Sequence, residues 1–236
     1  MLETLIRSER LAGLAERFLR AHYSARVGKD WYSGARVPEW FDHRADLFLW
    51  ADTRVPFWVE RGVFSHEVMF DGCRLLDLCC GDGFYPFYFY SGLARQIDAV
   101  DYDETAIEHA MRWHSDPRIR YARLDVVADP LPGSDYDVVT WDGAIEHFSL
   151  EQTRTVLRKV KDSMKPAGVL SGYTVIAGKQ HKHPDHQHEF ESGDEMRNVL
   201  SEFFTEARTL ETVYPERHNL YFRASDRADR LGGWQG

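Results

Sequence analysis

The sequence has few cysteines, no long apolar run and no excess of basic residues. Its 236 residues include 3 cysteines, of which Cys79 and Cys80 are adjacent. This is too few for a disulfide framework and is typical of a reducing compartment. No apolar run approaches the roughly 20 residues of a membrane span, and the N-terminus does not resemble a signal peptide. We therefore expect a soluble cytoplasmic protein without a membrane partner.

Basic charge is also scarce. The formal net charge is -9 and the isoelectric point is about 5.6. Binding to nucleic acid requires clustered lysine and arginine to neutralise phosphates. The composition thus argues against a nucleic-acid partner, while the oligomeric state stays open, with a homodimer as one option.

The chain has no internal repeat, and its length suits one α/β domain with an elaborated N-terminus. We predict a helical, aromatic cap over residues 1–70, an α/β domain over 71–228 and a loose tail over 229–236. The cap begins with an amphipathic helix over residues 4–24, whose apolar side chains recur at helical spacing.

Strand and helix patterns alternate through the α/β domain. The predicted strands cover 74–79, 96–101, 119–124, 136–142, 168–176, 206–213 and 218–225, and the predicted helices cover 84–94, 104–114, 150–163 and 192–203. Strands separated by helices indicate a mostly parallel sheet with right-handed crossovers. The short connection from Tyr214 to Arg217 favours an antiparallel hairpin at the end.

A glycine turn follows the first of these strands. The segment 75–83 reads Leu-Leu-Asp-Leu-Cys-Cys-Gly-Asp-Gly, so Gly81 and Gly83 let the backbone approach a ligand closely. Pro86 stands where a dinucleotide motif has a third glycine, and Asp77 and Asp82 would repel a pyrophosphate. A ligand with a positive centre fits better. Asp101, about 20 residues after the turn, is placed to accept from ribose hydroxyls.

These motifs resemble the class I S-adenosylmethionine-dependent methyltransferases. The resemblance extends through Leu124-Asp125, the segment Asp-Tyr-Asp-Val-Val-Thr at 135–140 and Lys-Pro-Ala-Gly at 165–168. It implies a Rossmann-like fold with a seven-stranded, mostly parallel sheet, a last strand that is antiparallel and helices on both faces. Cys79 replaces the usual first glycine, which we interpret as a change in the shape of the pocket.

The resemblance also implies the cofactor, S-adenosylmethionine, and the residues that hold it. Asp77 would lie near the methionine amine and Asp125 near the adenine amine, with a simple turn cap as the alternative for Asp125. Tyr102 would pack on the adenine. The full predicted set is Asp77, Cys79, Gly81, Gly83, Asp101, Tyr102, Asp125 and Asp142.

A candidate base follows the fourth predicted strand. The segment 141–147 reads Trp-Asp-Gly-Ala-Ile-Glu-His and resembles the Glu-His pair found there in the family. His147 is the first candidate to take a proton from the acceptor, and Asp142 is a second. We expect Glu146 to orient a partner or the substrate. The alternative for His147 is a residue at a helix start that bonds a neighbouring carboxylate.

A histidine-rich loop, residues 180–190, follows the fifth predicted strand. It contains His181, His183, His186 and His188 with an Asp and a Glu, so a divalent metal is one interpretation. The spacing matches no closed zinc site, and we favour a metal-free substrate loop. His186 and His188 are then alternative bases, and His181 and His183 face solvent.

Aromatic residues crowd the segment from Trp31 to Phe70. They either bury the segment against the sheet or line a lid over the site. The stretch with Trp31, Tyr32 and Trp40 is loop-like, so these three are the predicted substrate contacts.

We expect a methyltransferase of a small polar acceptor, most simply a hydroxyl of a sugar or secondary metabolite. Methylation of a small-molecule amine is the main alternative. A module that binds the cofactor without catalysis and an RNA methyltransferase are further ones.

Overall fold

The computed structural model describes residues 57–178, 184–214 and 217–232, together with helical positions between residues 11 and 25. Contacts divide the chain into two units, Met1–Trp58 and Val59–Gly236. In the first unit, the described positions agree with the predicted amphipathic helix. Trp31, Tyr32 and Trp40, and His181 and His183 of the loop, lie outside the described residues. No helix of the described residues is both long enough and apolar enough to cross a membrane.

The second unit contains one seven-stranded sheet in the order β3-β2-β1-β4-β5-β7-β6. The strands β1 to β5 run parallel, and β7 pairs antiparallel with both β5 and β6. This arrangement confirms the expected sheet with a reversed last strand. The strand bounds are β1 Arg74–Leu78, β2 Gln96–Asp101, β3 Ile119–Arg123, β4 Tyr136–Asp142, β5 Met164–Val175, β6 Glu206–Tyr214 and β7 Arg217–Ser225.

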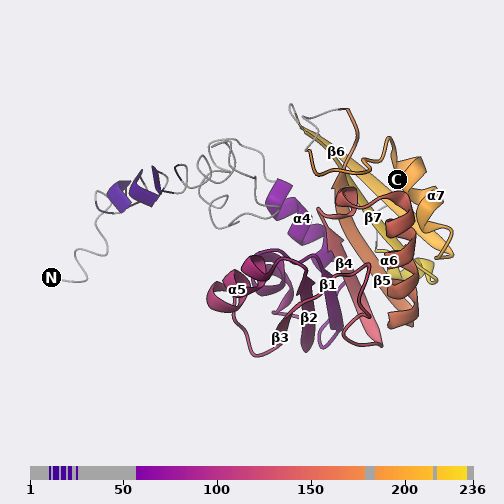
Figure 1. The fold of residues 1–236 in the computed structure, drawn as a ribbon, viewed down its shortest axis with the longest axis horizontal. Helices are drawn as coiled ribbons and strands as arrows, with labels where there is room; N and C mark the ends of the chain where they lie inside the picture. Colours follow the sequence, from indigo (N-terminus) through magenta and orange to yellow (C-terminus); the bar gives the residue numbers. More distant parts are fainter. Residues whose placement is uncertain are drawn as a thin grey trace. The chain divides into compact units, whose positions relative to one another are not determined.

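Helices cover both faces of this sheet (Figure 1). From β1, the strand order runs through β2 and β3 to one edge of the sheet, whereas β4 and β5 lie toward the other edge. Right-handed crossovers therefore place α5 on one face of the sheet and α6 and α7 on the other. The helical elements are α4 Phe57–His66, the π-helix η1 Pro86–Tyr90, α5 Glu104–Trp113, the short η2 Ile145–His147, α6 Leu150–Ser163, α7 Gly193–Leu200 and η3 Ala228–Arg230.

Side-chain caps fix where the longer helices begin. The Asp103 carboxylate accepts from the backbone N–H groups of Thr105 and Ala106 at the start of α5. Ser149 and Gln152 form a capping box at the start of α6. Each cap satisfies N–H groups that would otherwise lack a partner, so these helices start within a residue of the predicted positions.

Two predicted elements differ from the structure. The helix predicted over 84–94 ends at Tyr90 and is wound as a π-turn, in which the Ser91 N–H bonds the Pro86 carbonyl at 2.9 Å. The strand predicted over 168–176 begins earlier, at Met164, because the chain re-enters the sheet through a register shift opposite Tyr136 and Val138. Pro166 and Gly168 read as a turn, and the shift accommodates them within the strand.

The core lies between the sheet and the helices. The side chains of Leu76, Val139 and Leu170, on the three central strands, are fully buried. On α4, Phe64 packs against Tyr221 of β7 with ring centroids 4.8 Å apart. Phe64 therefore belongs to the core, which is the alternative given above for the aromatic residues of this segment.

Candidate functional site

The candidate site is at the carboxyl ends of β1, β2 and β4. The connections of β1 and β4 leave the sheet in opposite directions, so these two neighbours form the topological switch point where open α/β sheets bind ligands. Asp77 of β1, Asp101 of β2 and Asp142 of β4 all lie at this edge and are all buried. The tertiary structure thus brings together three of the predicted site residues.

The glycine turn adopts a left-handed backbone, as the motif predicted. Gly81 has a φ of 53° and Gly83 a φ of 74°. A side chain at Gly83 would also collide with Tyr121 and Ala110, where a Cβ would approach to 2.6 Å and 2.8 Å. Cys79 is left-handed too, with a φ of 56°, which explains why a glycine suits this position better than other residues.

Asp101 holds the turn in place. One of its carboxylate oxygens accepts from the Gly81 N–H at 2.8 Å, and the other accepts from the Asp103 N–H at 2.9 Å. A carboxylate has about four acceptor positions, so these two backbone bonds do not by themselves exclude bonds from ribose hydroxyls. Asp82, also buried, accepts from the Phe84 N–H at 3.1 Å and caps the following turn.

Asp77 and Asp142 are two buried carboxyl groups at the switch point whose pKa values are raised. Asp77 accepts from the Thr140 hydroxyl at 2.6 Å, and burial raises its pKa to about 8, with Asp142 adding to the rise. One oxygen of Asp142 accepts from the Tyr90 hydroxyl at 3.0 Å, while its Oδ1 is buried with no hydrogen-bond partner among the described residues. Burial raises the pKa of Asp142 to about 6, and Arg61 opposes this rise.

Arg61 was missed by the sequence analysis, which assigned residues 1–70 to the cap. It lies on α4, is buried, donates to the Asp142 backbone carbonyl and stands over the Tyr85 ring at 4.4 Å. Gly143 is needed beside it, because a Cβ there would lie 2.8 Å from the guanidinium. The available signal in the sequence was one arginine in the largely apolar segment 57–64. An arginine that is buried with such a segment needs a partner, which would have pointed to a buried acceptor near it.

Two predicted cofactor residues are more exposed. Tyr102 is 49% exposed, so its ring is available to a ligand. Asp125 is exposed and its Oδ1 accepts from the N–H groups of Val127 and Ala128 at 2.8 Å and 3.1 Å. Asp125 therefore caps a turn, as the alternative stated, and its contact with an adenine amine stays a prediction.

Two of the candidate bases, His147 and His186, form a second group together with Glu146. Glu146 is buried and accepts from the Thr174 hydroxyl at 2.9 Å. The rings of His147 and His186 meet edge to face with centroids 4.9 Å apart. His186 in turn pairs with Glu189, with 2.5 Å between Nδ1 and Oε1. The structure thus joins the Glu-His segment after β4 to the histidine-rich loop after β5.

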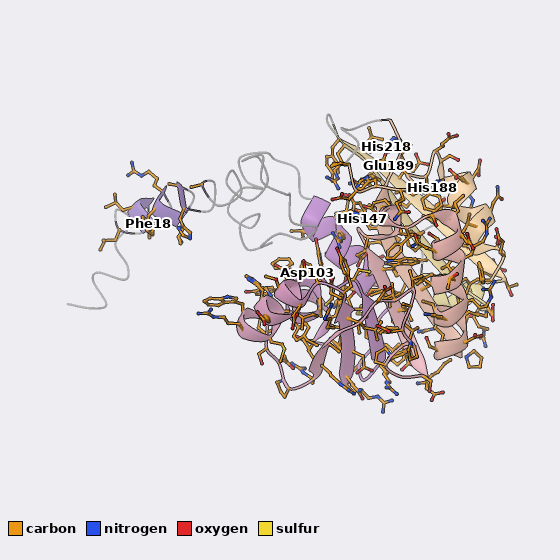
Figure 2. The ribbon with its side chains drawn as sticks, viewed as in Figure 1. Phe18, Asp103, His147, His188, Glu189 and His218 are labelled. Atoms are coloured by element: carbon orange, nitrogen blue, oxygen red, sulfur yellow. The ribbon has the colours of Figure 1, made fainter. Side chains whose placement is uncertain are left out.

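His188 faces elsewhere. Its Nε2 pairs with Glu195 of α7 at 2.9 Å, and its ring packs against Phe190. Figure 2 labels His147, His188 and Glu189 in the upper part of the sheet domain. Of the three candidate histidines, the structure therefore brings His147 and His186 into one group and pairs His188 with α7.

Comparison with known proteins identifies the domain. A family model described as a methyltransferase domain matches residues 75–168, which include the glycine turn, β2, β3, β4 and α6. Residues 75–168 therefore resemble a methyltransferase domain. A probable S-adenosylmethionine-dependent methyltransferase of Mycobacterium tuberculosis is 32% identical over 117 residues, and the match covers 48% of this chain and 41% of that protein. The chain thus matches less than half of the length of this curated relative.

Solved structures of other proteins share this fold. The DhpI–SAH complex has a TM-score of 0.56 at 18% identity and covers 90% of this chain and 98% of that one. The N-methyltransferase NodS from Bradyrhizobium japonicum has a TM-score of 0.60 at 15% identity and covers 72% and 96% of the two chains. The expected fold is confirmed, and S-adenosylmethionine as the cofactor agrees with the family match over residues 75–168 and with the name of the curated relative.

The residues present fit this cofactor. The edge gathers Asp77, Asp101 and Asp142 with the buried Arg61, and Asp142 Oδ1 is an acceptor in need of a donor. A ligand with a sulfonium and an ammonium group supplies positive charge and donors there, whereas a pyrophosphate would meet like charge. The roles of the individual side chains remain predictions.

Proposed function

We propose that the protein is a methyltransferase that transfers the methyl group of S-adenosylmethionine to a hydroxyl group of a small polar acceptor, such as a sugar or secondary metabolite. The observation that carries the proposal is the contact between His147 and His186, because His147 lies on the turn that directly follows Asp142 at the end of β4. A hydroxyl is a weak nucleophile until it loses its proton, so a base next to the cofactor site serves O-methylation directly.

The chain's residues divide the work as follows. The bound cofactor supplies an electrophilic methyl group on a positively charged sulfur. Asp77 and Asp142 would hold the positively charged cofactor by their negative charge. The bound cofactor would supply the methyl group to the acceptor oxygen and keep the electron pair of the broken carbon–sulfur bond, and His147 would take the acceptor's proton. Glu146 orients the group, and alignment of the two partners provides most of the rate enhancement.

The test is a transfer assay with labelled cofactor and a panel of sugars, hydroxylated metabolites and small amines. Replacing His147 by Ala should lower turnover of a hydroxyl acceptor by about 10²- to 10⁴-fold with unchanged cofactor affinity. His66→Ala, at an exposed end of α4, is the matched control and should leave turnover unchanged. Full activity of His147→Ala on a hydroxyl acceptor would refute the assigned base.

The alternatives give different results. A neutral amine acceptor needs no base before attack, so an N-methyltransferase would tolerate His147→Ala. Two solved structures with this fold are named as N-methyltransferases, NodS and a phosphoethanolamine enzyme of Haemonchus contortus. An RNA methyltransferase would bind RNA with steep salt dependence. A non-catalytic module would bind the cofactor and transfer nothing to any acceptor.

A further inference from the structure

The side chains of Glu146, His147 and His186 can each present one ligand atom within 4.8 Å of the other two. Two of these residues follow β4, and the third comes from the loop after β5. An ion equidistant from three atoms at this separation would lie about 2.8 Å from each, and zinc bonds to nitrogen and oxygen are about 2.0 to 2.2 Å. Side-chain rotations of less than about 1 Å per ligand close that difference.

Backbone hydrogen bonds hold the two segments together. The Glu146 carbonyl accepts from the N–H groups of both Gln187 and His188, at 2.9 Å and 3.1 Å. These bonds fix the loop at His186 directly against the turn that carries His147. The three side chains are therefore positioned by the fold, and their proximity does not depend on side-chain packing alone.

Supporting carboxylate and hydroxyl groups surround the three residues. Glu189 pairs with Nδ1 of His186, an arrangement that orients a metal-binding imidazole and raises its basicity. Thr174 donates to one oxygen of Glu146. Glu146 is 4% exposed, and the side chain of Glu189 is 5% exposed. Buried carboxylates beside two imidazoles make a charged environment that suits a cation.

We infer that Glu146, His147 and His186 form a binding site for one divalent transition-metal ion. Two imidazoles and one carboxylate suit zinc, iron(II) or cobalt(II), whereas magnesium prefers a set of oxygen ligands. Three protein ligands leave coordination positions open, as in catalytic metal sites. The sequence analysis expected no metal because it considered spacing within the loop alone, and the ligand set combines the loop with another segment.

The use of the ion rests on the proposed function, whereas its binding does not. An acceptor hydroxyl in an open coordination position would have a lowered pKa and a fixed orientation. A metal-bound His147 cannot accept the proton at the bound nitrogen, so the proton then leaves to solvent from the coordinated hydroxyl. Metal binding and the histidine base are thus two distinguishable ways to activate one acceptor at one place.

The experiment is a titration of the untagged, metal-stripped full chain with Zn²⁺ by calorimetry, and with Co²⁺ by its visible ligand-field spectrum. We expect one ion per chain and at least about 100-fold weaker binding for Mg²⁺. His147→Ala and His186→Ala should each weaken Zn²⁺ binding by about 100-fold or more. Glu189→Gln, which changes only the support of His186, should weaken it by about 10-fold.

Two controls separate this site from non-specific binding to a histidine-rich loop. His188→Ala removes a neighbouring imidazole that pairs with Glu195, and the double variant His181→Ala/His183→Ala removes the other two imidazoles of the loop. Both should bind Zn²⁺ as the parent does. Circular dichroism checks that each variant is folded. Equal loss in the controls and in His186→Ala, or no measurable Zn²⁺ binding by the parent, would overturn the inference.

Failure of the inference and failure of the proposed function give different results. Methyl transfer that proceeds unchanged with a chelator, by a chain that binds no Zn²⁺, overturns the metal site and leaves the function. Stoichiometric Zn²⁺ binding that is lost in His147→Ala, without transfer to any hydroxyl acceptor, supports the site and rejects O-methylation.

Discussion

Binding of S-adenosylmethionine should release protons, because a positively charged ligand meets a carboxyl group that is protonated in the free protein. Burial raises the pKa of Asp77 to about 8, so at pH 7 about 0.9 of a proton occupies this group. The pKa of Asp142 is raised to about 6, which adds about 0.1 of a proton. If the ligand's positive charge drives both groups to ionise, about one proton leaves per cofactor bound.

The assay is calorimetry of cofactor binding at pH 7 in buffers with different ionisation enthalpies. The dependence of the observed enthalpy on buffer gives the number of protons released. We expect about one for the parent chain and about 0.1 for Asp77→Asn. Affinity should also rise about 17-fold from pH 6 to pH 7 in the parent, and only about twofold in Asp77→Asn. Asp71→Asn, an exposed residue before β1, is the matched control.

Two results would refute this reasoning. Release of less than about 0.2 of a proton by the parent means that Asp77 is already ionised, or that it stays protonated when the cofactor is bound. Equal release by Asp77→Asn assigns the proton to another group. Either result removes Asp77 as the charge that recognises the ligand.

The same pKa has a consequence for stability without the cofactor. A carboxyl group with a higher pKa in the folded state binds more protons when folded, so its contribution is most favourable below the unfolded pKa near 4. Stability then falls as pH rises and levels off above about 8. We expect the melting temperature of the cofactor-free chain to be higher at pH 6 than at pH 8, and Asp77→Asn to reduce this difference.

Three further predictions concern stability. Cys79→Val should lower the unfolding free energy by about 2 kcal/mol or more, because a β-branched residue fits poorly at a φ of 56°. Cys79→Gly should stay within about 1 kcal/mol of the parent. Urea unfolding measures both variants. The Glu60 carboxylate accepts from the hydroxyl groups of Thr212, Tyr214 and Tyr221 at 2.5 to 2.7 Å. Glu60→Ala should therefore lower the unfolding free energy by about 2 to 4 kcal/mol. The control Glu104→Ala, at an exposed residue, should lower it by less than about 0.5 kcal/mol. Arg61→Met should cost about 3 kcal/mol and raise the pKa of Asp142 further, and a loss below about 1 kcal/mol would contradict the assigned contacts.

The sequence by itself determined the elements of the sheet domain and the residues of the proposed cofactor edge. These features are local: strands and helices follow from the spacing of apolar residues, and the caps Asp103 and Ser149 act within three residues. The glycine turn and Asp101 belong to one strand–turn–helix–strand unit, so their proximity follows from the order of the elements. The π-turn at Pro86–Tyr90 was not predicted, because its wider winding leaves no distinct pattern in five residues.

The tertiary structure alone decided which distant residues meet. Arg61 and Asp142 are 81 positions apart, and no spacing rule connects a helix before β1 with the end of β4. The same holds for the grouping of His186 with Glu146 and His147, which depends on backbone hydrogen bonds between two loops, whereas His188, two positions further, pairs with α7. Local sequence fixes which chemical groups are available, and long-range packing fixes which of them share a site, because contacts between distant segments depend on the whole fold.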